Sequence, residues 1–295
     1  MKTIRRPFLA LLVFALAAAT FRPALATDYD PAKLVIPALN PIPKVTPERS
    51  VLKNGLVLYL LEDHSLPRAY GQIYLRASTT WSPAEKTGLG GVTAQVMRTG
   101  GSAAKTGDAI DDRLAAIGAN LYSNMSSDVA TAGFYCMAEN ADEVLGLLAD
   151  VVRRPAFPDD KIELAKVGIR RSIASRNDEM GSVLNRVATA SVFGKDSPYA
   201  RIPEYATLEA ITRDDCVKFH QLCYSPDRAI LVVYGDFKSA DMKLRVTQAF
   251  GDWAKSASKL PAMPAMPASH QTRLVFAPKD DVTQSGVLLC QLGFK

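Results

Sequence analysis

Apolar residues recur at two spacings in this chain, every second residue in some segments and about every 3.6 residues in others. The two kinds of segment do not follow each other in strict alternation. Residues Ala69–Ala77 alternate in polarity as a strand does, whereas Ile110, Leu114 and Ile117 fall on one face of a helix. This mixture predicts an α+β fold, in which helices pack on one face of a mixed, largely antiparallel sheet. A chain of 295 residues with 48% hydrophobic and 22% charged residues is suited to a globular core.

The remaining elements follow the same two patterns. A strand signal over Val51–Leu61 surrounds Asn54-Gly55, a dipeptide typical of hairpin turns. Further strands are expected over Ala119–Asn124, Asp128–Ala138 and Ala229–Tyr234, the last continuously apolar as a strand buried on both faces would be. One helix is expected to end at Gly118, and another to begin after a capping pair, Asn140 and Glu143. A longer helix should begin at Pro158, with its inner face formed by Ile162, Ala165, Ile169 and Ile173. Three more are expected over Ser182–Phe193, from a cap at Thr212 and Asp215 to near Cys223, and over Met242–Phe250.

The N-terminus has the pattern of a secretory signal. Basic residues precede the apolar run Phe8–Ala19, and Ala24-Leu25-Ala26 has the small-x-small form of a cleavage site. The run is shorter than the roughly 20 residues that a membrane-spanning helix needs. We therefore expect cleavage after Ala26, a periplasmic mature protein and no membrane span after cleavage.

The charge balance supports no nucleic-acid partner. The formal charge is +5, but Lys2, Arg5, Arg6 and Arg22 belong to the expected signal. Without them, 31 basic residues face 30 acidic residues. Such a balance gives no reason to expect nucleic acid or an anionic membrane surface as a partner.

Composition divides the chain after the signal. Residues 27–48 are proline-rich and read as an extended arm, and residues 49–254 carry the periodic elements of one complete domain. Residues 255–270 are rich in Ala, Pro and Met and indicate a linker. Residues 271–295 are interpreted as the start of a truncated second domain, with strands over Arg273–Ala277 and Val287–Leu292.

Four segments, in order, resemble the pitrilysin/insulinase-type peptidases, which carry the inverted zincin motif. They are NGLVLYLLEDHSLPRAYGQIYLRAST from Asn54, KTGLGGVTAQVMRTGGS from Lys86, ELAKVGIRRSIASRNDEM from Glu163 and YSPDRAILVVYGDF from Tyr224. The resemblance implies a metallohydrolase-like clamshell, each half of which is built from two similar α+β domains. This chain would supply one complete domain and the start of the next.

Active members of that family carry H-x-x-E-H on a helix. Two histidines four residues apart share a helical face and can bind one zinc ion, and the Glu can accept a proton from the zinc-bound water. The resemblance puts Gly91 and Gln95 at the histidine positions and Ala94 at the base position, and it puts the third ligand within one residue of Ser172, with Arg171 beside it. None of these is a histidine or a carboxylate, so we expect no zinc, no catalytic residue and no other cofactor in this chain.

Two other patterns admit a structural and a functional interpretation. The pair Gly90-Gly91 fits close helix packing better than a phosphate-cradling loop, because G-x-x-x-x-G-K is absent. Cys216, His220 and Cys223 share a helical face and could together bind a soft metal, but Phe219 joins that face, which favours a core stripe.

The remaining cysteines and histidines indicate no site. Cys216 and Cys223 would lie roughly 10 Å apart on one helix, too far for a disulfide. We therefore expect mostly buried thiols among the four cysteines. His64 in a polar loop and His270 in the linker have no obvious partner. The cysteines are Cys136, Cys216, Cys223 and Cys290.

The leading hypothesis is a catalytically inactive subunit of this peptidase family. Such a subunit would pair with a paralogue that carries H-x-x-E-H and zinc, and the pair would process or degrade peptides in the periplasm. A stand-alone peptide-binding or scaffold module and a truncated remnant are the alternatives. An active zinc metalloendopeptidase, as the family name suggests, is disfavoured by the missing ligands.

Overall fold

The computed structural model describes residues 37, 39, 41, 45–267 and 272–293. The chain divides into two compact units, Met1–Val45 and Thr46–Lys295, and every element below belongs to the second unit. The expected signal at residues 1–26, most of the expected arm and His270 lie outside the described residues.

A six-stranded sheet with the order β1-β2-β6-β3-β5-β4 forms the centre of the second unit. Neighbouring strands run antiparallel, except for β2 and β6, which run parallel. This confirms the predicted α+β class and the largely antiparallel sheet. The strands are β1 (Glu48–Val51), β2 (Val57–Glu62), β3 (Arg68–Leu75), β4 (Asn120–Met125), β5 (Ala130–Met137) and β6 (Ala229–Gly235).

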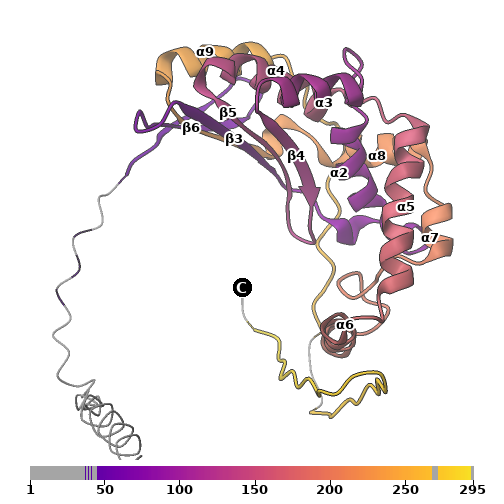
Figure 1. Cartoon of the computed structure of the whole chain (residues 1–295). Helices are drawn as coiled ribbons and strands as arrows, with labels where there is room; N and C mark the ends of the chain where they lie inside the picture. The colour runs from indigo at the N-terminus through magenta and orange to yellow at the C-terminus, as the bar shows by residue number, and fades with distance from the viewer. Residues whose placement is uncertain (1–36, 38, 40, 42–44, 268–271, 294–295) are drawn as a thin grey trace, which may run out of the picture. The chain divides into compact units, whose positions relative to one another are not determined.

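Helices cover one face of this sheet. Figure 1 shows α9, α4 and α3 along one side of the strands, with α2 and α8 continuing the layer. The helices are α2 (Leu89–Thr99), α3 (Gly107–Ala116), α4 (Ala141–Arg153), α5 (Asp159–Ser175), α6 (Met180–Phe193), α7 (Tyr205–Glu209), α8 (Arg213–Cys223) and α9 (Ser239–Phe250). Each predicted helix is therefore present within a few residues of its expected bounds.

Several turns and caps form as the sequence predicts. Asn54 and Gly55 lie in the turn between β1 and β2, where Gly55 has φ +93°, a conformation that favours glycine. Gly118 has φ +61° after the end of α3. At the start of α8 the Thr212 hydroxyl accepts from the Asp215 N–H, and the Asp215 carboxylate accepts from the Thr212 N–H in return.

The expected capping pair before α4 is wrong. Asn140 precedes the helix but makes no capping hydrogen bond with its side chain. The Glu143 carboxylate instead accepts two hydrogen bonds from the Arg113 guanidinium of α3, at 2.8 and 2.7 Å. A bidentate charged pair is stronger than a neutral cap, so Glu143 links two helices rather than closing its own.

The expectation that β6 is buried on both faces is also wrong. Ala229, Leu231 and Val233 are buried, but Ile230 and Tyr234, which alternate with them along the strand, are each 42% exposed. The helices cover one face only, so the outward side chains of this central strand stay accessible. A continuous apolar run therefore does not distinguish a strand covered on both faces from one with an open apolar face.

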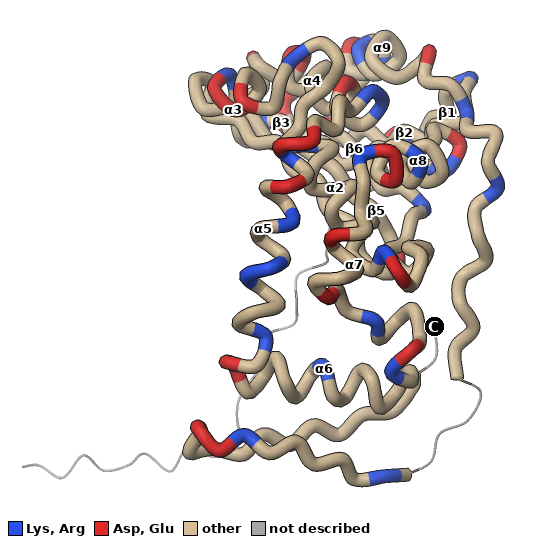
Figure 2. Tube along the Cα trace, turned by 90° about the vertical axis from the view of Figure 1, so that its right-hand side faces the viewer, with Lys and Arg blue, Asp and Glu red and all other residues tan. Residues whose placement is uncertain are grey.

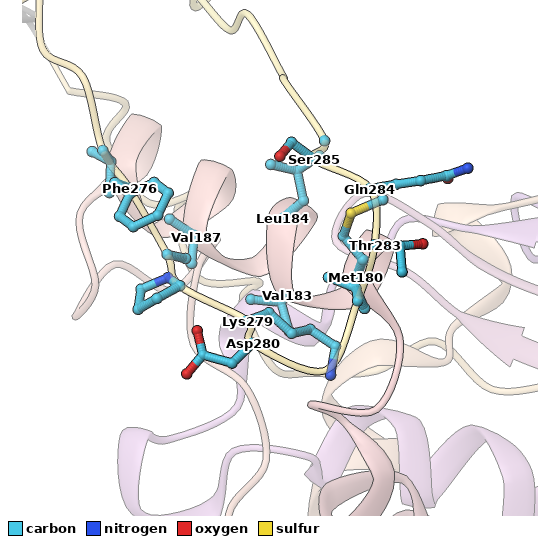
Figure 3. A pocket seen from close by; sticks show the side chains of 15 residues that line it. Met180, Val183, Leu184, Val187, Phe276, Lys279, Asp280, Thr283, Gln284 and Ser285 are labelled. Carbon is cyan, nitrogen blue, oxygen red and sulfur yellow. The ribbon is translucent and has the colours of Figure 1, made fainter.

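The two strands expected over Arg273–Ala277 and Val287–Leu292 do not form among the described residues. Part of this segment instead packs beside α6, which carries a single charged residue and is nearly all tan in Figure 2. Met180 and Leu184 of α6 line a pocket of about 280 Å³ with Phe276 and neighbouring residues (Figure 3). A strand needs a partner strand for its N–H and C=O groups, and the described part of the chain supplies none here.

Within the residues that the structure describes, the helices are too short or too polar to cross a bilayer.

Candidate functional site

The helix at which the resemblance places the zinc site is α2, and its first turn is shaped by glycines. Gly88 precedes it with φ +110°, and the Gly90 N–H donates to Ser82 Oγ at 3.2 Å. A Cβ on Gly90 would lie 3.0 Å from Met125 Sδ and 3.2 Å from Thr79 Cα. Gly90 thus allows close packing, as expected, whereas a Cβ on Gly91 would meet nothing within 4 Å.

The four positions that the resemblance aligns with the zinc site differ in their surroundings. Gly91 and Gln95 are exposed on α2, one helical turn apart. Ala94 between them is only 1% exposed and belongs to the core. Ser172 is exposed on α5, a helix that contacts α2. The predicted ligand positions therefore lie on two packed helices.

These side chains do not fit a zinc ion. Gly91 and Ala94 offer no donor atom, and Gln95 and Ser172 are neutral oxygen donors where zinc prefers imidazole, thiolate or carboxylate. The described residues also contain no group of three His, Cys, Asp or Glu side chains placed to hold a metal. No proton acceptor stands at the base position, so no hydrolytic step can be derived from this set of residues.

The stripe of Cys216, His220 and Cys223 lies in the core rather than at a site. All three side chains are buried, and His220 Nε2 lies 2.8 Å from the Val152 carbonyl oxygen. The His220 ring stacks on Tyr224 at 4.6 Å. Burial lowers the pKa of His220 to about 4, so the imidazole is neutral at physiological pH.

The thiols are equally unsuited to metal binding. Burial raises the pKa of Cys216 to about 11 and that of Cys223 to about 12, which keeps both protonated. Cys136 is buried as well, whereas Cys290 is exposed, and all four cysteines are unpaired. The expectation of mostly buried thiols is confirmed.

His64 has partners that the sequence did not indicate. Its Nδ1 lies 2.6 Å from Asp236 Oδ1 and its Nε2 lies 3.4 Å from Glu62 Oε2. Hydrogen bonds with Asp236 and then Glu62 raise the pKa of the exposed His64 imidazole. The two carboxylates lie at the ends of the parallel neighbours β2 and β6, so the cluster ties two strand ends together.

The open face of the sheet is rich in tyrosines from five strands. Tyr70 stacks on Tyr234 at 4.6 Å between ring centroids, and Tyr122 donates to Gln72 Oε1 at 3.1 Å. Burial raises the pKa of Tyr122 and of Tyr234, so both phenols stay neutral. We call this set the tyrosine face: Tyr59, Tyr70, Tyr74, Tyr122, Tyr135 and Tyr234.

Sequence reasoning placed only part of this face. The alternation of Ala69–Ala77 put Tyr70 and Tyr74 on one side of a strand, but which strands adjoin β3 was not known. Strand order brings β6 to one side of it and β5 to the other, with Tyr234 and Tyr135 directly opposite Tyr70. Arg201, which lines a pocket at Gly91, was likewise not singled out.

Two family models match this chain. The model described as Insulinase (Peptidase family M16) matches residues 85–199, and the model described as Peptidase M16 inactive domain matches residues 210–294. Together they cover about two thirds of the chain and include the last three of the four resembling segments.

Individual relatives agree with these models. An uncharacterized zinc protease of Mycobacterium leprae is 33% identical over 108 residues, which is 36% of this chain and 24% of the relative. The crystal structure of a peptidase M16 inactive domain from Pseudomonas fluorescens superposes with a TM-score of 0.68 at 19% identity, covering 75% of this chain and 54% of that one.

A second similar structure is the periplasmic protease PqqL from Escherichia coli. It has a TM-score of 0.67 at 14% identity and covers 79% of this chain and 27% of that one. At such identity these structures show a common fold alone. The chain spans little more than half of the first of these structures and about a quarter of the other two relatives.

Proposed function

Because this chain belongs to the M16 (insulinase) peptidase family, we propose that it is a non-catalytic member that binds peptides. One observation carries the proposal: the positions that the resemblance aligns with two histidines and two glutamates hold Gly91, Ala94, Gln95 and Ser172 instead, on the helices α2 and α5, which pack together. A protein that retains the packing without the ligands retains the architecture of a peptidase domain without its reaction.

The tyrosine face is the surface best suited to hold a peptide. Tyrosine offers a large apolar ring and a hydroxyl for little loss of conformational freedom, which favours contact with varied side chains. The outer edge of β4 has no partner strand among the described residues, and the outward N–H and C=O groups of an edge strand can pair with an extended peptide.

We further propose that hydrolysis belongs to a partner. A paralogue with H-x-x-E-H would supply the zinc ion, and this chain would contribute a wall of the peptide-binding chamber. A stand-alone peptide-binding module would use the same face without a partner. Reconstitution distinguishes the two, because only the paired protein gains proteolytic activity when both chains are mixed.

The proposed location is the periplasm. It is supported by the signal pattern of the first 26 residues and by the fold shared with a protease described as periplasmic. Fractionation of cells that express the full chain tests it: a processed protein in the periplasmic fraction, beginning at Thr27, is the expected result.

The test of function measures metal, hydrolysis and binding on the same preparation. We expect zinc in the purified chain at no more than the level of a Gln95→Ala, Ser172→Ala variant, and no cleavage of unfolded casein by the chain alone. One zinc per chain that these substitutions remove would overturn the proposal.

Peptide binding is measured by fluorescence anisotropy with labelled unfolded peptides. Tyr70→Ala with Tyr234→Ala should weaken binding at least about fivefold, the effect of losing an anchor worth more than about 1 kcal/mol. Tyr205→Ala is the matched control, because Tyr205 is 50% exposed on α7 and lies off the sheet. Equal affinities for both variants and the native chain would contradict a role for the tyrosine face.

A further inference from the structure

A pocket of about 240 Å³ opens at the start of α2, beside the position where the first zinc-binding histidine would stand. This volume lies just below the roughly 300–1,000 Å³ of small-molecule sites, so the pocket suits one chemical group rather than a whole ligand. It is lined by Thr79, Ser82, Thr87, Gly88, Gly91, Ile169, Pro198, Arg201 and Pro203.

The pocket has room where a side chain is missing. A Cβ on Gly91 would meet no atom within 4 Å. Gly91 lies in the first turn of an 11-residue helix, where its N–H has no acceptor within the helix, whereas the Gly90 N–H already donates to Ser82 Oγ. The aligned peptide dipoles place partial positive charge at this end, which favours an anion.

Arg201 is the one charged residue that lines the pocket, and its guanidinium is incompletely paired. It donates to the Ser82 carbonyl oxygen at 3.2 Å. Its Nε is buried and has no hydrogen-bond partner among the described residues. Arg201 as a whole is half-buried, but a buried Nε–H without an acceptor is costly, so an acceptor from outside the chain is expected here.

Neighbouring arginines differ in this respect. Arg176 pairs with Glu204 at 2.7 Å and Arg170 pairs with Glu209 at 2.5 Å. No carboxylate of the described residues makes such a pair with Arg201. The cation is therefore positioned by the fold, through Ser82, but is not neutralised by it.

We propose that this pocket binds a carboxylate of a bound peptide, either a C-terminal carboxylate or an acidic side chain. The planar guanidinium of Arg201 matches the geometry of a carboxylate, and the start of α2 adds the Gly91 N–H and positive potential. The pocket keeps a positive charge next to the position that binds a metal cation in the active enzymes, but no base stands beside it. It thus retains a peptide without cleaving it. The assignment of this carboxylate to a bound peptide rests on the proposed function.

The experiment compares two labelled peptides that differ only at the C-terminus, one a free acid and one an amide, on the full chain. We expect the free acid to bind about 10-fold to 100-fold more tightly, the range for a charge-assisted hydrogen-bond pair. Arg201→Gln should abolish this preference. Gly91→Leu should abolish it as well, by filling the pocket while leaving the charge of Arg201 in place.

Arg171→Gln is the matched control. Arg171 is an exposed arginine of α5 two residues from Ile169, on another side of that helix, so its loss removes the same charge without altering the pocket. This variant should keep the preference. A preference that survives both Arg201→Gln and Gly91→Leu, or that Arg171→Gln also abolishes, would overturn the proposal.

Two further probes separate the possible failures. Acetate is titrated into the full chain and the Arg201 Nε–H resonance is followed by NMR; a saturable shift absent in Gly91→Leu is expected. Acetate binding without any peptide binding would refute the proposed function and the peptide source together. Peptide binding that is sensitive to Tyr70 but not to the carboxylate would leave the proposed function standing and refute the pocket. Inorganic phosphate that binds more tightly than acetate and than the free-acid peptide would show a free oxyanion site and refute the peptide source.

Discussion

The two adjacent glycines of α2 should respond oppositely to alanine. Replacing a helical glycine by alanine stabilises a helix by about 0.5–1 kcal/mol, because the backbone loses less freedom on folding. At Gly91 nothing opposes this gain, since a Cβ there meets no atom within 4 Å. Gly91→Ala should therefore raise the free energy of unfolding by about 0.5–1 kcal/mol.

At Gly90 the same gain competes with a steric cost. A Cβ would lie 3.0 Å from Met125 Sδ and 3.2 Å from Thr79 Cα. The methionine side chain can move away, but moving the Thr79 backbone costs more free energy. Overpacking of this kind costs about 1–3 kcal/mol. The gain in helix propensity is common to both variants, so the difference between them isolates the packing cost. Gly90→Ala should be about 1–3 kcal/mol less stable than Gly91→Ala.

Urea unfolding of the full chain, followed by tryptophan fluorescence, measures this difference. Trp253 is buried and Trp81 half-buried, so both should report the transition. In a domain of this size, 1 kcal/mol corresponds to a shift of about 2–4 °C in Tm. Equal stability of the two variants, or a less stable Gly91→Ala, would refute the packing of α2 described above and with it the open space on which the anion pocket depends.

Other predictions concern the metal positions, the exposed histidine and a helix cap. Combining Gly91→His, Gln95→His and Ser172→Glu should create a zinc site that holds about one ion per chain, measured by mass spectrometry. A variant without the Ser172 change should bind less zinc. No zinc in the triple variant would contradict the placement of these three positions beside one another on α2 and α5. The pKa of His64 is raised in the folded protein, so His64 stabilises the fold below about pH 6.5 and loses this contribution as pH rises through the folded pKa. His64→Gln should flatten the pH dependence of Tm over that window. An unchanged pH profile would show that the interaction of His64 with Asp236 and Glu62 does not stabilise the fold. Thr212→Ala should cost about 1 kcal/mol in urea unfolding by removing the cap of α8, whereas Thr212→Ser should cost much less.

Local rules predicted the elements well because their causes lie within a few residues. The turn at Asn54-Gly55 and the cap at Thr212 depend on neighbours two or three positions away, and both formed as expected. The capping role predicted for Glu143 was wrong for the opposite reason, because its partner Arg113 lies 30 residues earlier, on another helix. The open face of β6 was missed because periodicity reports which side chains are apolar but not which are covered.

The Arg201 pocket and the tyrosine face, on which the proposals are based, depend on contacts between residues still farther apart in the sequence. Arg201 reaches the Ser82 carbonyl across 119 residues, and no spacing rule connects the two. The tyrosine face requires the strand order, which puts β6 between β2 and β3. The positions that correspond to the family's zinc ligands were placed from the sequence alone, by a resemblance over ordered segments, and they stay a prediction.

The separation of the two faces of α2 explains how a fold of this kind can persist without its chemistry. Val92, Val96 and Met97 are fully buried and pack into the core, whereas Gly91 and Gln95 point outward. Changes at the outward positions remove ligands without removing core volume. Ala94 is the exception, because it is 1% exposed. A glutamate restored there would place a carboxylate in apolar surroundings, which is costly unless a metal or a donor pairs with it. We therefore expect Ala94→Glu to destabilise the chain when made alone, and to cost less in the background of the zinc-binding triple variant with zinc present. An equal cost in both backgrounds would show that the base position has lost its connection to the metal positions.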